Sequence, residues 1–272
     1  MLDSSSWDVV SGAEAGQVVL GVDFPARRPV RAGFLDLAAR IGPGYRFLQT
    51  KPPMVRSCQR LRGDAYVGPW ISGIRQDRHQ VLAVCGYRIG SVYAAAIAEG
   101  IAQWQAMPKI ILFDPQVASI DLLSLEFCSE IGSITSLLGD DEIERAGKVA
   151  AEFSNAAPSD VADVAAEMVE SYLEIITAPF ERVGLGDARS NKFTAAFEAY
   201  MAWLSTSSQI DPSLAWKSST GIASSAYAGL PASDGRPLVG QMIPFEVSHA
   251  DLLRSDCVAQ AVRGLLESSR EN

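Results

Sequence analysis

The sequence predicts an α/β protein built on a mostly parallel sheet with a helical insertion. Up to Asp114, short apolar runs alternate with amphipathic stretches, which is the pattern of strands alternating with helices. Over about 90 residues, 119–208, helical periodicity replaces every strand signal, and strand character returns only after residue 220. A strand, a tight turn, a long helix and another strand follow one another over 80–113, as in a right-handed βαβ unit.

The first half of the chain contains most of the expected strands. Apolar runs indicate strands, and apolar residues at helical spacing indicate helices, with Gly42-Pro43-Gly44 ending the first helix. In chain order we expect a strand over 17–22, a helix over 34–41, a strand over 45–49, a short helix over 66–75, a strand and an alanine-rich helix over 80–102, and a strand over 109–113.

The second half is expected to be helical first and to return to the sheet later. Ser159 and Asp160 are suitable N-cap residues for a helix over 161–177, and a second helix is expected over 193–204. Strands over 221–227 and 238–247 and a C-terminal helix holding Val258, Val262 and Leu266 follow. The prediction is therefore one domain over 1–272 with an insertion at about 119–208.

Composition and charge exclude several classes of protein. With 48% hydrophobic and 20% charged residues the chain can bury a large core, so a disordered or fibrous protein is excluded. The net charge of −9 and a pI near 4.8 argue against a nucleic-acid partner. The charge is uneven, because residues 1–90 carry a net +5 and residues 91–272 a net −14. The basic excess is either a patch for an acidic partner or a scattered solvated set; it includes Arg27, Arg28, Arg31, Arg56, Arg60 and Arg62.

Cofactor and membrane signals are missing from the sequence. No apolar stretch approaches the roughly 18 residues of a membrane helix, and the N-terminus lacks the basic start of a signal peptide. We therefore expect a cytoplasmic protein with no membrane partner. The four cysteines lie far apart without a CxxC pair, and no GxGxxG or P-loop motif occurs, so no metal site and no cofactor are expected.

The turn between the strand and the helix of 80–102 has an informative sequence, Gly86-Tyr87-Arg88-Ile89-Gly90. A GxSxG nucleophile elbow occupies the same strand-to-helix position, with a serine where Arg88 stands here. Glycines suit such a turn because side chains two positions from its strained centre would collide with neighbouring backbone. Alternatively, Gly86 and Gly90 only make a tight βα turn, with or without a bound phosphate.

Together with other segments of the chain, this turn resembles the thioesterases that accompany polyketide and nonribosomal peptide synthetases, a branch of the α/β-hydrolase family. Their elbow reads like GYSxGG before an alanine-rich helix, as GYRIGS and Ala94–Ala98 do here. Asp114 in ILFDP, 26 residues after Arg88, matches the family's acid, and His249 in HADLL matches its histidine. The resemblance covers about 17–267 and implies an α/β-hydrolase fold with a helical lid at 119–208.

Departures from the family pattern affect the expected chemistry. Arg88 cannot act as a nucleophile, because its guanidinium stays protonated and offers only donors. The family's glycine-containing oxyanion loop is replaced by a segment containing Asp23 and Phe24, and Ser91 stands where a second glycine is usual. From the resemblance, the candidate catalytic residues are Arg88, Asp114 and His249. The candidate oxyanion or substrate-binding residues are Ile89, Asp23, Phe24, Tyr87 and Ser91.

The function is left open between three explanations. In one, His249 oriented by Asp114 acts as a base while Arg88 binds a carboxylate, enolate or phosphate. In another, the protein is a catalytically inactive pseudo-thioesterase that binds a carrier protein or an acyl ligand. In the third, Ser91 is a displaced nucleophile. We favour the first, a thioesterase-like enzyme of natural-product biosynthesis acting on an acyl thioester; His249 and Asp114 could also have purely structural roles, and His79 is expected in a loop.

Overall fold

The computed structural model describes residues 6–12, 17–24, 31–53, 62–155, 160–184, 187–230 and 238–268. The chain forms two compact units. The first comprises Met1–Pro52, Gly63–Val117 and Ile210–Asn272, and the second comprises Pro53–Arg62 and Ala118–Gln209. Four arginines of the expected basic patch, Arg27, Arg28, Arg56 and Arg60, lie outside the described residues.

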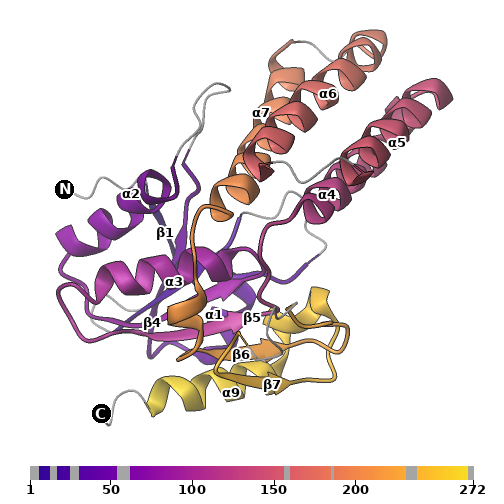
Figure 1. Cartoon of the computed structure of the whole chain (residues 1–272). Helices are drawn as coiled ribbons and strands as arrows, with labels where there is room; N and C mark the ends of the chain where they lie inside the picture. Colours follow the sequence, from indigo (N-terminus) through magenta and orange to yellow (C-terminus); the bar gives the residue numbers. More distant parts are fainter. Residues whose placement is uncertain are drawn as a thin grey trace. The chain divides into compact units, whose positions relative to one another are not determined.

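The first unit contains a seven-stranded sheet in the order β1-β3-β2-β4-β5-β6-β7 (Figure 1). Only the pairing of β1 with β3 is antiparallel, and every other neighbouring pair is parallel. The mostly parallel sheet expected from the sequence is therefore confirmed. The strands are β1 (Trp7–Ser11), β2 (Val18–Val22), β3 (Arg46–Thr50), β4 (Val81–Tyr87), β5 (Lys109–Phe113), β6 (Thr220–Ala223) and β7 (Gln241–Pro244).

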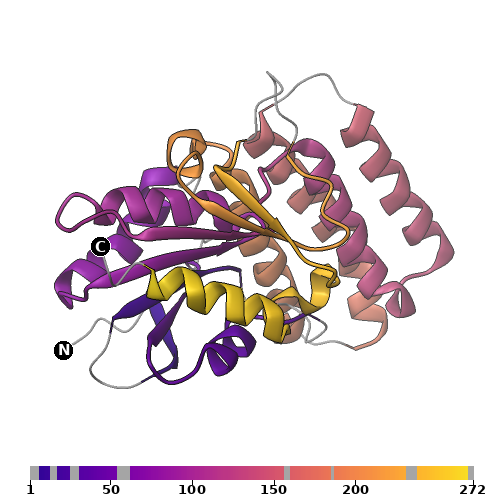
Figure 2. The same ribbon diagram turned by 90° about the horizontal axis from the view of Figure 1, so that it is seen from below.

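Helices cover both faces of this sheet (Figures 1 and 2). On one face α1 (Phe34–Ile41) packs with α9 (Asp256–Glu267), and their apolar residues join a buried cluster with Phe47, Tyr87 and Phe113. On the other face α2 (Gly63–Gln76) and α8 (Ser213–Trp216) pack on α3 (Gly90–Ile101). The central strand β4 is therefore buried along its whole length, as its continuous apolar run indicates.

Several element boundaries differ from the sequence expectations, and one strand was not anticipated. The strand expected over 221–227 ends at Ala223, because the amide of Ser224 leaves the ladder and donates to Asp114 Oδ1. The strand expected over 238–247 is limited to β7, and the amide of Gly240 donates to Trp216 O outside the ladder. Strand β1 was not predicted, because its residues, none of them fully buried, give no apolar alternation.

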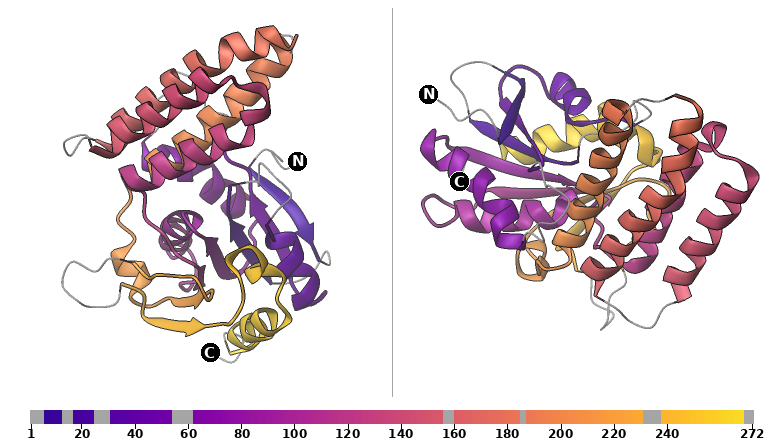
Figure 3. Two further views of the ribbon diagram at one scale, coloured as in Figure 1. Left: turned by 90° about the vertical axis from the view of Figure 1, so that its right-hand side faces the viewer. Right: turned by 90° about the horizontal axis from the view of Figure 1, so that it is seen from above.

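The second unit contains helices α4 (Ile120–Ser133), α5 (Asp140–Asn155), α6 (Val161–Arg182) and α7 (Asp187–Ser207), with a 3-10 turn over Thr135–Leu137 (Figure 3). Its core includes the contacting rings of Phe127, Tyr172 and Phe197. Asp160 caps α6 by accepting from the amide of Ala162 at 2.7 Å, while Ser159 lies outside the described residues. That this unit forms a lid stays a prediction.

None of the described helices combines the length and the apolar character needed to cross a membrane.

The turn between β4 and α3 requires glycine at two positions. A Cβ on Gly86 would lie 2.5 Å from Ser91 Cα, and a Cβ on Gly90 would lie 1.9 Å from Val22 O. Both obstacles are backbone atoms, so no side-chain rearrangement could relieve them. Gly86 is therefore required by the close approach of β4 to the start of α3, and Gly90 by the close approach of α3 to the end of β2.

We expect Gly90→Ala to lower the free energy of unfolding by about 3 kcal/mol, because the methyl group must displace the backbone of β2. Urea unfolding followed by circular dichroism measures this change. Gly264→Ala on α9 is the matched control, because nothing lies within 4 Å of its added Cβ. A similar loss in both variants would contradict the backbone clash.

Candidate active site

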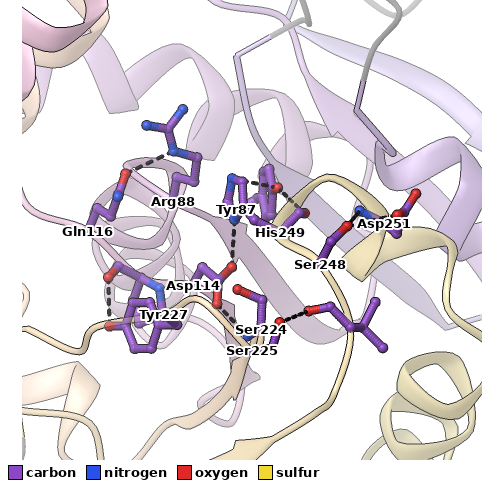
Figure 4. Close-up of polar contacts among 12 residues, drawn as sticks. Tyr87, Arg88, Asp114, Gln116, Ser224, Ser225, Tyr227, Ser248, His249 and Asp251 are labelled. Carbon is purple, nitrogen blue, oxygen red and sulfur yellow. Dashed lines mark hydrogen bonds and ion pairs between the residues drawn. The ribbon is translucent and has the colours of Figure 1, made fainter.

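Arg88 stands at the centre of the β4–α3 turn with a φ of 51°, in the left-handed region. Its amide donates to Phe113 O at 2.9 Å, and its carbonyl accepts from the amide of Gln116 at 3.3 Å. Its Nε also donates to the Gln116 side chain at 2.9 Å (Figure 4). Main-chain and side-chain bonds thus connect the elbow to the segment that follows β5.

Asp114 directly follows β5 and is 2% exposed. Its φ of 42° is also left-handed, and its amide donates to Ile222 O at 3.0 Å. The two carboxylate oxygens have separate partners: Oδ1 accepts from the amide of Ser224 at 2.7 Å, and Oδ2 lies 2.6 Å from His249 Nδ1. The structure therefore brings Asp114 and His249 together as the sequence resemblance implies.

His249 begins the 3-10 turn His249–Arg254, which Ser248 caps by accepting from the amide of Asp251. Its side chain is 36% exposed. With Nδ1 directed to Asp114, the other ring nitrogen, Nε2, lies 2.9 Å from the hydroxyl oxygen of Tyr87 (Figure 4). Tyr87 Oη also lies 2.9 Å from the main-chain oxygen of His249, and the two rings stack at 5.1 Å between centroids.

The Tyr87 ring also contacts Arg31, which is partly buried and forms an ion pair with buried Asp23. The Arg31 guanidinium lies 4.8 Å from the centroid of the Tyr87 ring, while its Nη2 lies 3.0 Å from Asp23 Oδ2 and donates to Phe24 O. Burial raises the pKa of Tyr87 to about 12, an effect that the Arg31 charge opposes. The phenol is therefore neutral at physiological pH.

The remaining candidates have mainly structural contacts. Ser91 is fully buried, and its hydroxyl donates to Gly86 O at 3.2 Å, a geometry that does not suit a displaced nucleophile. Ile89 is 3% exposed at the N-terminus of α3, and Phe24 is half-buried. The Asp23 amide donates to Thr50 Oγ1 and its carboxylate pairs with Arg31, so Asp23 supports the loop rather than facing a substrate.

A cavity of about 370 Å³ opens at these side chains. Its described lining comprises Arg88, Asp114, Gln116, Ser224, Ala226, Tyr227, Ala228, Gly229 and His249. The Ser224 hydroxyl is buried and has no hydrogen-bond partner among the described residues, and the Tyr227 hydroxyl donates to Pro115 O at 2.8 Å. One guanidinium, one carboxylate, one imidazole and several neutral polar groups therefore line this space.

Sequence reasoning did not identify four residues of this region: Arg31 as a partner of Tyr87, and Gln116, Ser224 and Tyr227 as cavity residues. Gln116 lies two positions after Asp114, so its nearness to the acid was an available signal. Ser224 and Tyr227 follow β6 and carried no motif. No cluster of metal-binding side chains occurs in the described part of the chain.

The parallel sheet, the strand-turn-helix elbow, the acid after the next strand and the histidine near the C-terminus together define an α/β-hydrolase fold. No family model and no curated protein matches the sequence.

Solved structures support this assignment of the fold. The enol-lactonase from Burkholderia xenovorans LB400 is similar with a TM-score of 0.52 and 12% identity, over 96% of this chain and 95% of that one. The protein DBJA is similar with a TM-score of 0.52 and 13% identity, over 97% and 94%. The Vlm2 thioesterase domain has a TM-score of 0.49 and 13% identity, over 97% and 96%. The first two similarities show the fold over nearly the whole chain.

The raised pKa of Tyr87 predicts a loss of stability in alkali. An unfolded tyrosine ionises near pH 10, whereas folded Tyr87 resists ionisation up to about pH 12, so its contribution is complete below pH 10 and is lost as the pH rises to 12. We expect the difference in unfolding free energy between wild type and Tyr87→Phe to narrow by about 2 kcal/mol over that range. Urea unfolding at pH 9 to 12 measures it, and a constant difference would contradict the prediction.

Proposed function

We propose that the chain is an enzyme that acts on an acyl thioester, or on an intermediate derived from one, without forming an acyl-enzyme. The observation that carries the proposal is the 2.6 Å contact between His249 Nδ1 and Asp114 Oδ2, made beside a cavity that Arg88 also lines. A histidine oriented by a carboxylate and exposed to a polar cavity is suited to acid–base chemistry.

His249 and Asp114 have distinct roles in this proposal. The Asp114 carboxylate accepts a hydrogen bond from Nδ1–H, orients the ring and makes Nε2 the nitrogen that exchanges a proton. In a hydrolysis, water would attack the thioester carbonyl as Nε2 takes a water proton, and the C–S bond would then break. The same proton would pass to the departing thiolate.

Arg88 would bind negative charge in the same cavity. A guanidinium offers several N–H donors and stays charged, so it suits a substrate carboxylate, an enolate or the oxyanion that develops during attack. It cannot form an ester with the substrate. Cyclisation and acyl transfer without a covalent intermediate are compatible with these roles, and natural-product thioesters carried on an acyl or peptidyl carrier protein are the substrates that the sequence resemblance suggests.

One observation favours a second candidate, a catalytically inactive protein that binds an acyl ligand or a carrier protein. Both ring nitrogens of His249 have protein partners, since Nδ1 contacts Asp114 and Nε2 contacts Tyr87. An imidazole held in this way supports the architecture of the cavity without exchanging protons.

Thioester turnover separates the two candidates. Against a panel of short and long acyl thioesters, we expect kcat/KM to fall about 100-fold in His249→Ala, through loss of acid–base catalysis, and by a similar factor in Arg88→Ala, through loss of anion binding. Thiol release detected with a chromogenic disulfide measures the rate.

Arg254→Ala is the control for loss of a positive charge near the site, because this exposed arginine pairs with Asp251 outside the cavity lining. Equal inactivity of the wild type and all three variants across the panel would remove the enzymatic proposal.

Ligand binding tests the second candidate. Calorimetry with short-chain fatty carboxylates should then show binding to the wild type without turnover of the matching thioester. Arg88→Gln should weaken the binding about tenfold, because it removes one charge-assisted hydrogen-bonding partner. Unchanged affinity in Arg88→Gln would contradict a role for this guanidinium.

A further inference from the structure

The contact between Tyr87 and His249 involves three atoms at close range. Tyr87 Oη lies 2.9 Å from Nε2 and 2.9 Å from the main-chain oxygen of the same histidine. When Nδ1 donates to Asp114, Nε2 of the neutral imidazole and the main-chain oxygen of His249 are both acceptors, so the single phenolic proton is donated to one of them at a time. One hydroxyl group thus lies within hydrogen-bonding distance of both the side chain and the main chain of His249.

The Tyr87 hydroxyl that contacts Nε2 does not belong to the described lining of the cavity. His249 and Asp114 line the cavity, whereas Tyr87, itself 1% exposed, is absent from the cavity lining over the described residues. Nδ1 is directed to the carboxylate and Nε2 to the phenol, so neither nitrogen is directed into the cavity.

Tyr87 has little freedom to release this contact. It is the last residue of β4, where its register partner is Phe113 of β5, and its ring contacts both His249 and the Arg31 guanidinium. Arg31 is in turn paired with buried Asp23 at 3.0 Å. Movement of the histidine therefore opens the contact more readily than movement of the tyrosine.

We propose that Tyr87 is a positioning residue that holds Nε2 of His249 out of the cavity, so that proton transfer to a substrate requires the imidazole to leave the phenol. The requirement that the imidazole leave the phenol before it transfers a proton rests on the proposed function. The contact itself is a property of the folded chain and can be tested without any substrate.

Reaction with diethylpyrocarbonate tests the proposal, because it modifies an accessible imidazole nitrogen and the chain has only two histidines. Peptide mass spectrometry measures the modification rates of His79 and His249 separately. The His249 side chain is 36% exposed and the His79 side chain 19%, so exposure alone predicts faster modification of His249. The proposal predicts the reverse order in the wild type, and faster modification of His249 would overturn it.

Tyr87→Phe removes the hydroxyl and keeps the ring against His249 and Arg31. We expect the modification rate of His249 to rise about fivefold, the factor that corresponds to one neutral hydrogen bond, while the rate of His79 stays unchanged. Tyr227→Phe is the matched control, because Tyr227 lines the cavity and its hydroxyl donates to Pro115 O instead. An equal His249 rate in the wild type and Tyr87→Phe, or the same rise in Tyr227→Phe, would overturn the proposal.

A spectroscopic measurement separates positioning from general loosening of the fold. In a long-range ¹H–¹⁵N spectrum, Tyr87→Phe should shift the Nε2 resonance of His249 and leave both His79 nitrogens in place. Shifts at both histidines would indicate loosening and contradict the assigned role. If diethylpyrocarbonate modifies the histidines as predicted but the protein turns over no thioester, the Tyr87 contact is supported and the enzymatic proposal is removed. The positioning role of Tyr87 and the proposed function can therefore fail separately.

Discussion

The candidate site depends on the close approach between the first residue of α3 and the last residue of β2. Only a hydrogen atom fits at the Cα of Gly90 facing Val22 O, where a methyl carbon would lie 1.9 Å away. This approach allows β4 to turn sharply into α3, and the turn presents Tyr87 and Arg88 on different sides of the chain. The direction of both side chains is therefore set by backbone packing.

A second constraint joins the ends of β4 and β5. Arg88 and Asp114 both have positive φ, which costs free energy for residues other than glycine. The cost is offset by hydrogen bonds from Arg88 N to Phe113 O and from Asp114 N to Ile222 O. Each strained residue is thus tied to the next strand of the parallel sheet, and the two side chains are held at one edge of it.

Much of the fold and part of the site could be predicted from the sequence for a clear physical reason. Buried parallel strands and amphipathic helices leave strong local patterns, and the elbow glycines, Asp114 and His249 stand at fixed places relative to them. The contacts of Tyr87 with His249 and with Arg31 carry no local pattern, because they join segments distant in the chain. The same holds for Ser224, whose place beside Asp114 depends on where β6 ends.

The contact between Nε2 of His249 and the Tyr87 hydroxyl also affects what a serine nucleophile could do in this chain. A serine installed at position 88 would meet an imidazole already bonded to the adjacent tyrosine, so the new hydroxyl and the phenol would compete for one nitrogen. The effects of changes at positions 87 and 88 should therefore be non-additive.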